Sequence, residues 1–440
     1  MVVGAKIRDL RKKLGLTQEQ LAGNELTKSY VSQVELGRIH PSEKALRIMA
    51  RRLGKPLGYF LENTDDLRTI DVLLKASQAL WSTGRLDEGV NGLNEALHLA
   101  ERTGREDVLA RIRTIMGQLE LVRGNWQKAE HHLETALSLV HGADYPVQWV
   151  QTATTLGIAA GRLGLYHKAV QAFQYALDYA LKLPDEEAEI RSQALSCYGD
   201  FCYGQGHWLS AIELYQAALK SQHRLPPARR AELHASLACA LWQAERREEA
   251  QHTVSLAEAD IAAIHDPEGL ALAQIAMARA YATTLQYAPA QDLLHYAIGH
   301  FSRDKNPEAE AAAWETRLWL AWKTKDLPLL LQYHDHAKSL PSNWPWNQVK
   351  VQGLRFLGLV TAEENPSQAL TYFEEALRLA DPAERLQLQL EYWLTAWRAG
   401  QADAPEHIWT LMREHEMPSL DHPLIIRPWR LQTLPQAIAQ

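Results

Sequence analysis

The sequence predicts an all-α protein in which a small N-terminal helical domain precedes a long right-handed array of helical hairpins. Charge separates the two parts: residues 1–62 carry 12 Lys and Arg against 6 Asp and Glu, and the remainder carries 34 against 47. Repeats of about 40 residues indicate a solenoid of stacked helical units. A small or apolar anchor residue recurs at intervals of 40, 40, 42, 39, 40, 40 and 39, at Gly89, Ala129, Ala169, Ala211, Ala250, Ala290, Leu330 and Ala369. Alanine stands seven positions after each anchor, so we expect close helix crossings there.

The composition fits a soluble cytoplasmic protein. Hydrophobic residues make up 46% and charged residues 22% of the chain, which is ordinary for a globular fold. No apolar run approaches the ~18 residues of a membrane span, and the charged start contains no secretory signal. Cys197, Cys202 and Cys239 lack the C-x-x-C spacing of zinc or redox sites. We therefore expect no membrane contact, no metal and no cofactor.

Dense helix-terminating signals predict five short helices in the N-terminal domain. Gly15 ends the first helix, and Thr17 is placed to cap the second, with Gln20 completing a capping box. Thr27 can cap the third helix, which Gly37 ends. Short helices joined by a tight turn and supported by flanking helices indicate a helix-turn-helix arrangement. The second to fifth helices are expected at residues 18–22, 28–36, 43–53 and from 57 onward.

The residues around this turn resemble the phage-repressor (XRE) type of helix-turn-helix. The resemblance lies in GLTQEQLA at 15–22, YVSQVELGR at 30–38 and the Pro-Ser pair at 41–42. The stretch between Ala22 and Val31 is one residue shorter than the usual pattern, as in the PlcR and NprR type of peptide-sensing regulator. The resemblance implies an ion pair between Arg11 and Glu35 and a DNA-binding function for residues 1–62.

One face of the third helix carries the side chains expected to meet DNA. Val31 and Val34 should face the domain core against Leu21 and Ala22, which leaves the opposite face for base edges and the flanks for phosphates. The expected base-reading residues are Lys28, Ser29 and Gln33, and the expected phosphate contacts are Gln18, Ser32, Arg38 and His40. Because one head offers few contacts, we expect a homodimer on a two-fold symmetric double-stranded operator. A repressor-like fold without DNA binding remains the alternative.

The remaining pattern resembles tetratricopeptide repeats. A glycine lies five residues before each of the first four anchors, and a small residue lies twelve before each of the first six. We expect about eight to nine hairpins over residues 71–415, with a linker at 63–70 and a cap or tail at 416–440. The ~40-residue period exceeds the standard ~34 and implies longer helices or loops.

The first helix of each hairpin is expected to face a concave groove. Trp126 and Trp208 are expected to fill seams between repeats. Amide, charged and aromatic side chains at groove positions suit an extended peptide, whose backbone needs donors and acceptors. The candidate peptide-binding residues are Gln78, Arg111, Gln118, Gln151, Thr154, Gln193, Asp200, Tyr203, Trp242 and Arg279. The alternative for each is an ordinary solvated helix face.

No catalytic constellation is found. The pairs His131-His132 and His334-x-His336 do not have the H-E-x-x-H order of a metalloprotease. The glycines at 204–206 fall short of a dinucleotide fingerprint. We therefore expect a protein that is not an enzyme.

A repressor-type head before a long repeat body resembles the RRNPP regulators of Gram-positive bacteria. The resemblance implies a transcription regulator that binds a short imported signalling peptide and thereby shifts the population of DNA-competent dimers. Two alternatives remain. The repeats could instead dock a protein partner, or they could act like Rap proteins on a response regulator.

Overall fold

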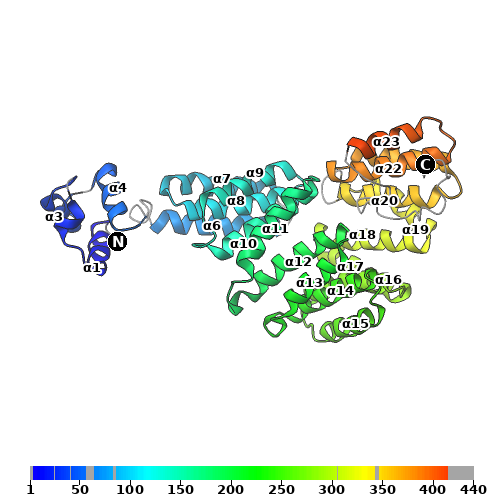
Figure 1. The fold of residues 1–440 in the computed structure, drawn as a ribbon, viewed down its shortest axis with the longest axis horizontal. Helices are drawn as coiled ribbons and strands as arrows, with labels where there is room; N and C mark the ends of the chain where they lie inside the picture. The colour runs from blue at the N-terminus through cyan, green and yellow to red at the C-terminus, as the bar shows by residue number, and fades with distance from the viewer. Residues whose placement is uncertain are drawn as a thin grey trace. The chain divides into compact units, whose positions relative to one another are not determined.

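The computed structural model describes residues 3–23, 25–39, 41–55, 64–82, 86–304, 306–341 and 346–414 (Figure 1). These residues form 22 α-helices and two short 3-10 turns, and no strand lies among them. The predicted all-α class is therefore confirmed. The fifth helix expected from residue 57 and the tail expected at 416–440 lie outside the described residues.

The N-terminal domain begins with four short helices, each bounded where its capping residues predict. They are α1 (Val3–Lys13), α2 (Gln18–Ala22), α3 (Lys28–Glu35) and α4 (Glu43–Arg52). The capping box before α2 is formed: the Gln20 amide donates to Thr17 Oγ1 at 3.1 Å, and the Thr17 amide donates to Gln20 Oε1 at 2.7 Å. Thr27 caps α3 through the Tyr30 amide at 3.1 Å.

The core of this domain lies where its apolar residues predict. Leu21, Val31 and Val34 are at most 1% exposed and pack with residues of α1 and α4. Gly4 fixes the approach of α1 to α3, because a Cβ at this position would lie 1.9 Å from the Val34 carbonyl oxygen. Any side chain at residue 4 would force the two helices apart.

The rest of the described chain consists of nine helical hairpins, in which each anchor residue lies on the second helix. The hairpins pair α6 (Thr64–Ser82) with α7 (Leu86–Thr103), α8 (Glu106–Val122) with α9 (Trp126–Leu139), α10 (Pro146–Arg162) with α11 (Tyr166–Ala180), α12 (Ala188–Gly204) with α13 (Trp208–Leu219), α14 (Pro227–Gln243) with α15 (Arg247–Ala262), α16 (Pro267–Thr283) with α17 (Tyr287–Asp304), α18 (Pro307–Thr324) with α19 (Leu327–Ala337), α20 (Trp346–Thr361) with α21 (Pro366–Leu379), and α22 (Pro382–Arg398) with α23 (Ala404–Glu414). Residues 64–70, expected in a linker, are instead the first turns of α6.

The recurring small residues of the first helices have a direct steric cause. A Cβ at Gly157 would lie 2.7 Å from the Phe173 ring, and one at Gly199 would lie 2.8 Å from the Tyr215 ring. Both rings come from the second helix of the same hairpin, four residues after its anchor. Each glycine therefore makes room for one buried ring.

The turns inside six successive hairpins, from the second to the seventh, share one left-handed residue. Gly124, Gly164 and Gly206 adopt φ of 74°, 74° and 78° there. Three later repeats place a residue with a side chain at the same point of the turn, at Glu245, Leu285 and Lys325, with φ of 64°, 68° and 54°. These three repeats keep the turn geometry and accept the strain that glycine would avoid.

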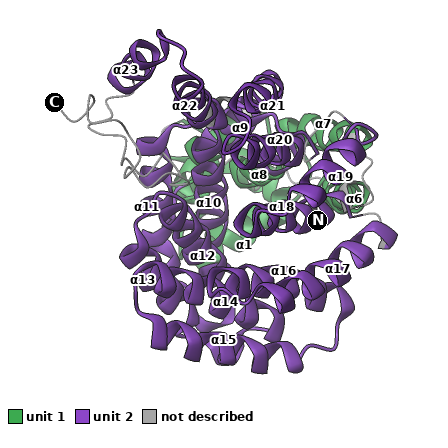
Figure 2. Cartoon of the chain, turned by 90° about the vertical axis from the view of Figure 1, so that its right-hand side faces the viewer, with its two compact units in different colours: residues 1–116, 135–140 green, residues 117–134, 141–440 purple. Residues whose placement is uncertain are grey.

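The chain divides into two compact units (Figure 2). One comprises residues 1–116 and 135–140, and the other comprises residues 117–134 and 141–440. The smaller unit therefore contains the N-terminal domain and the first hairpin, whereas the larger unit contains the seven hairpins from α10 onward. Each unit is considered separately below.

Candidate functional site

The outer face of α3 presents polar side chains to solvent. Lys28, Ser29 and Gln33 are exposed, whereas Val31 and Val34 point into the core, as the sequence predicts. Lys28 Nζ lies 4.0 Å from a Glu19 carboxylate oxygen, and both side chains remain largely exposed. An ion pair so open to water is weak, so Lys28 can exchange this partner for a phosphate or a base.

A buried carboxylate locks α1, α2 and α3 together. Arg11 donates to both oxygens of Glu35, at 2.6 and 2.9 Å, and to the Leu16 carbonyl at 2.8 Å. Gln18 Nε2 also donates to Glu35, at 2.8 Å. Burial by itself raises the pKa of Glu35, but the hydrogen bonds from Arg11 and Gln18 outweigh it and hold the pKa below its ordinary value. The ion pair implied by the resemblance is present.

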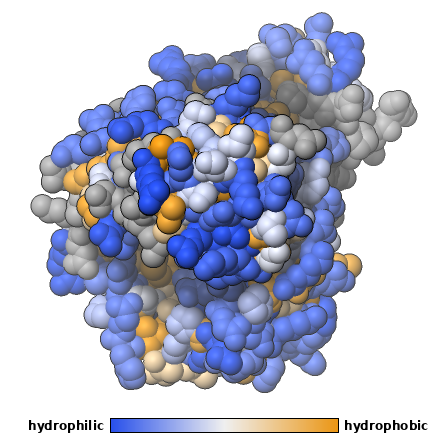
Figure 3. All heavy atoms as spheres, turned by 90° about the vertical axis from the view of Figure 1, so that its left-hand side faces the viewer, coloured by the Kyte–Doolittle hydropathy of each residue, from blue (hydrophilic) through white to orange (hydrophobic). Residues whose placement is uncertain are grey.

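Gln18 therefore has a structural role, through its hydrogen bond to Glu35, in addition to the phosphate contact expected of it. One N–H of its side-chain amide is used by Glu35, and the second remains for a DNA phosphate. Ser32 is half-buried at the flank of α3, and Arg38 is exposed just beyond its end. His40 lies outside the described residues. The face of the molecule drawn in Figure 3 is mainly hydrophilic, with scattered hydrophobic patches.

A role for Arg52, which connects two helices of this domain, was not predicted from the sequence. Arg52, in the last turn of α4, donates through Nη1 to the carbonyl oxygens of Leu21 and Ala22 at the C-terminal end of α2. Its Nη2 pairs with Glu25. A cation at a helix C-terminus satisfies carbonyls that have no partner in the helix. A run of arginines at the end of an amphipathic helix was the available signal.

The helix-turn-helix family model matches residues 7–60. Residues 7–60 are a helix-turn-helix domain. The match covers the whole of α2, α3 and α4, including the exposed face of α3. The helix-turn-helix domain therefore gives the chain a DNA-binding module of the kind that transcription regulators carry. No curated protein sequence matches the chain.

Several solved structures are similar to the chain at low sequence identity. Bacillus thuringiensis PlcR, in complex with the peptide PapR7 and DNA, is 18% identical, with 59% of this chain and 94% of PlcR covered and a TM-score of 0.38. A Rap protein complexed with competence and sporulation factor is 12% identical (79% and 99% covered, TM-score 0.49). Yeast Tom70 is 13% identical (93% and 84% covered, TM-score 0.49).

All ten candidate peptide-binding residues lie on the first helices of their hairpins. In the smaller unit, Gln78 and Arg111 are exposed, and Arg111 Nη1 lies 3.5 Å from the Asp71 carboxylate. In the larger unit, Gln118 is half-buried on α8 and Gln151 is exposed on α10. The Thr154 side chain is 5% exposed, and its hydroxyl has no hydrogen-bond partner among the described residues.

The larger unit brings Asp200, Tyr203 and Arg279 together from α12 and α16. Burial raises the pKa of Asp200, against lowering contributions from the Tyr215 hydroxyl and the Arg279 charge. Burial also raises the pKa of the Tyr203 hydroxyl, and the positive charge of nearby Arg279 opposes this rise. The side chains of Asp200 and Arg279 are nevertheless both exposed to solvent. A ligand can therefore reach an acidic and a basic side chain here.

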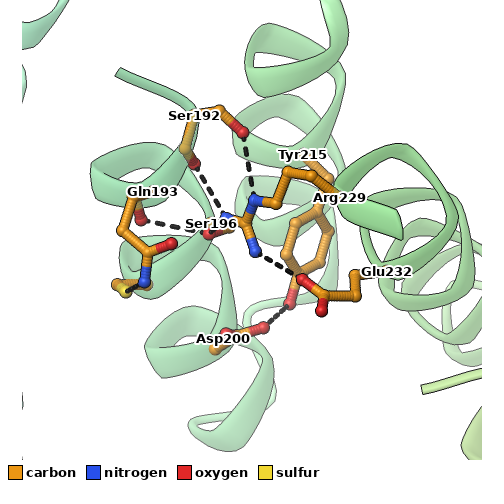
Figure 4. A network of polar contacts seen from close by, with 8 residues as sticks. Ser192, Gln193, Ser196, Asp200, Tyr215, Arg229 and Glu232 are labelled. Carbon is orange, nitrogen blue, oxygen red and sulfur yellow. Dashed lines mark hydrogen bonds and ion pairs between the residues drawn. The ribbon is translucent and has the colours of Figure 1, made fainter. Parts of the chain in front are cut away.

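A polar network that sequence reasoning missed supports this cluster (Figure 4). Arg229 on α14 donates to the Ser192 carbonyl at 3.3 Å, to the Ser196 hydroxyl, and to Glu232 Oε2 at 2.8 Å. Ser196 in turn donates to the Gln193 carbonyl at 3.0 Å. The network fixes α14 against α12, the helix that carries Gln193, Asp200 and Tyr203.

The last hydrogen bond at this cluster joins the two helices of one hairpin. Tyr215 on α13 donates its hydroxyl to Asp200 Oδ1 at 2.6 Å. Trp242 is half-buried in a neighbouring apolar cluster, with the Arg247 guanidinium 5.2 Å from its ring centre.

Within the described residues, no group of three His, Cys, Asp or Glu side chains could hold a metal ion. None of the described helices is long and apolar enough to cross a bilayer.

Proposed function

We propose that this protein is a transcription regulator that binds an operator as a homodimer and senses a short signalling peptide with its repeats. The observation that carries the DNA-binding part is the exposed donor face of α3 within a matched helix-turn-helix domain. Lysine and glutamine are residue types that read guanine and adenine edges in the major groove. The Arg11–Glu35–Gln18 contacts support the proposal by holding this face rigid.

The DNA-binding proposal is tested with the full-length protein and a library of genomic DNA fragments. Replacing Lys28 and Gln33 with alanine should remove the sequence preference, because each good base contact is worth about 1–3 kcal/mol, or roughly 5- to 150-fold in affinity. Lys220→Ala is the matched control, since it removes the same charge from an exposed site at the end of α13. If the double variant selects the same fragments as the parent, the assignment of α3 is wrong.

The homodimer follows from the size of the contact that one head can make. A single small module buries about 600–1,000 Å² on DNA, and dimers reach useful specificity by occupying two half-sites. We expect the protected operator to be a pseudo-palindrome with half-sites about one helical turn apart. Analytical ultracentrifugation of the DNA complex should find two protein chains per operator; a single bound chain would contradict the proposal.

The peptide part rests on the first helices of the larger unit. Asp200 and Arg279 are exposed side chains of opposite charge that lie close enough to interact. Such a surface suits a ligand with both donors and acceptors along its length, as an extended peptide backbone has. Peptide binding would shift the dimer between DNA-competent and incompetent forms, with a coupling of about 1–3 kcal/mol.

The peptide proposal is tested by purifying the protein from its native host and analysing what co-purifies by mass spectrometry. A bound peptide of fewer than about ten residues is expected. Asp200→Asn and Arg279→Gln should each weaken binding of that peptide, whereas Asp292→Asn, on the exposed face of α17, should not. A stoichiometric protein in place of the peptide would favour the docking alternative and overturn peptide sensing.

A further inference from the structure

The larger unit contains a contact between residues 255 positions apart in the sequence. The Trp126 indole donates from Nε1 to Asp381 Oδ2 at 3.1 Å, joining the start of α9 to the start of α22. Trp126 is 3% exposed, and α10 also packs against α22. Trp126 was expected to fill a seam between neighbouring repeats. It is buried, but its polar atom binds the last hairpin of the array.

Asp381 uses its carboxylate in an unusual way for its position. It is the N-cap of α22, yet its side chain makes no capping hydrogen bond with the backbone of that helix. An N-cap aspartate ordinarily accepts from the second or third amide of its helix. Here the side chain of Asp381 accepts a hydrogen bond from the Trp126 indole instead. The residue therefore serves the contact between distant hairpins rather than local capping.

Glu384, one turn further along α22, lies beside this contact. Gln352 on α20 donates to Glu384 Oε1 at 2.8 Å, and the charges acting on Glu384 come from Asp381, from Glu315 on α18 and from Arg162 on α10. The Arg162 guanidinium also lies 5.8 Å from the centre of the Trp126 ring. When every carboxylate is ionised, three negative charges share one nearby guanidinium.

This crowding disfavours the charged form of Glu384. Burial disfavours the charged carboxylate and raises the pKa of Glu384 to about 7. The negative charges of Asp381 and Glu315 add to this rise. Beyond Gln352, Arg355 and Glu391 form a separate buried pair, and Gln352 Oε1 accepts from Arg355 Nη1 at 3.1 Å. Gln352, held in place by Arg355 on its far side, donates to Glu384 and so opposes the rise in pKa, as does the Arg162 charge, but burial outweighs both.

We propose that Trp126, Asp381 and Glu384 form a clasp that holds the α9 end and the α22 end of the larger unit together and loosens when Glu384 ionises. An opened clasp would return Glu384 to water and to an ordinary carboxyl pKa of ~4.3. Because the closed form holds the proton more tightly, closure strengthens as the pH falls through about 7. Each unit of difference in pKa corresponds to about tenfold in the closing equilibrium, so up to roughly several hundred-fold is available between pH 8 and pH 4.

The clasp is tested by measuring a distance across it in the full-length protein. Spin labels are placed at the exposed positions Lys128 on α9 and Glu406 on α23, after the three native cysteines are replaced by alanine. Pulsed electron resonance should give a narrow distribution at pH 5.5 that broadens toward longer distances at pH 8.5. Glu384→Gln, which keeps an acceptor for Gln352 but cannot ionise, should stay narrow at both values.

Two further variants separate the clasp from general packing. Trp126→Phe keeps the buried ring and removes the N–H, so it should broaden the distribution at both pH values. Trp208→Phe makes the same change at the equivalent position of the fourth hairpin and should leave the wild-type behaviour intact. The proposal fails if Trp126→Phe matches Trp208→Phe, or if Glu384→Gln retains the pH response. If the spin labels perturb the repeats, amide hydrogen exchange of α9 and α22 can be measured instead, and these helices should be less protected from exchange at pH 8.5 than at pH 5.5 in the parent protein.

Discussion

The buried ion pair between Arg355 and Glu391 allows a sharp test of how the last hairpins are stabilised. Arg355 Nε and Nη2 donate to the two oxygens of Glu391 at 2.8 and 2.6 Å. The residues are 3% and 0% exposed, and Gln387 adds a hydrogen bond to Glu391 at 3.2 Å. Both charges have therefore lost their water and depend on each other.

Replacing either Arg355 or Glu391 alone should lower the free energy of unfolding substantially. Glu391→Leu leaves a buried guanidinium that keeps one side-chain acceptor, Gln352, among the described residues, and Arg355→Met leaves a buried carboxylate. Breaking such a pair typically costs about 3–5 kcal/mol, because one charge stays buried without compensation. The double variant removes both charges and fills the space with apolar atoms, so it should cost far less than the sum and lie within about 1–2 kcal/mol of the parent.

The assay is urea unfolding of the parent, the two single variants and the double variant, with hydrogen exchange of α20 and α22 as a local probe. The expected coupling between the two sites is at least about 3 kcal/mol. Additive costs would refute the reasoning, since they would mean that the two side chains do not compensate each other. The same comparison at 0.5 M salt should change little, because a buried pair is poorly screened.

Two further predictions concern the turns and the N-terminal domain. Leu285→Gly should stabilise the protein by about 0.5–1 kcal/mol, because φ is 68° there and glycine relieves the strain; thermal unfolding measures it, and the same change at Thr284, whose φ is −85°, should destabilise. The stability that Glu35 gives the helix-turn-helix domain should be fully present above the ordinary glutamate pKa of ~4.3 and be lost as the pH falls through its lowered pKa. Hydrogen exchange of α1 to α3 against pH measures it, and Glu35→Gln should remove the pH dependence while Glu19→Gln should not.

The local features of the fold could be predicted from the sequence because their causes lie within one hairpin or one helix. The anchors, the turn glycines and the helix caps at Thr17 and Thr27 act on neighbours a few residues away. Glycine at 157 and phenylalanine at 173 are complementary inside a single repeat, so the period of the sequence records their contact. The same local features recur along the nine hairpins of the described residues.

Contacts between distant repeats could not be predicted in the same way. The position of Trp126 in the repeat predicts that its ring is buried, but nothing in the repeat indicates that its N–H reaches Asp381. Arg355, within the otherwise apolar run at residues 353–360, was a signal for a buried partner, although the run does not indicate which acidic residue supplies it. The extent to which the candidate peptide-binding residues converge depends on the packing of successive hairpins, which periodicity alone does not give.

Buried polar groups in the larger unit fall into two kinds, and the difference bears on where a ligand binds. The groups of Arg355 and Glu391 satisfy each other, so their burial is compensated within the chain. The Thr283 side chain is 7% exposed, and its hydroxyl forms no hydrogen bond of ordinary geometry among the described residues, although it lies near enough to the Tyr203 hydroxyl and the Cys239 thiol to oppose the rise that burial gives the pKa of each. Leaving a buried hydroxyl without a partner costs about 1–3 kcal/mol, so a hydroxyl kept only for packing would be better replaced by a methyl group.

A valine at residue 283 separates these two roles. If the hydroxyl serves the proposed peptide, Thr283→Val should raise the stability of the free protein and weaken binding of the co-purified peptide, measured by thermal unfolding and by calorimetry. A gain in stability together with a loss of peptide affinity would support a role in binding. A residue that only packs would change the stability and leave the affinity unaltered. Thr316→Val is the matched control: that hydroxyl is buried on α18 but donates to the Ala312 carbonyl at 2.9 Å. Its replacement should bring no gain in stability and no loss of affinity.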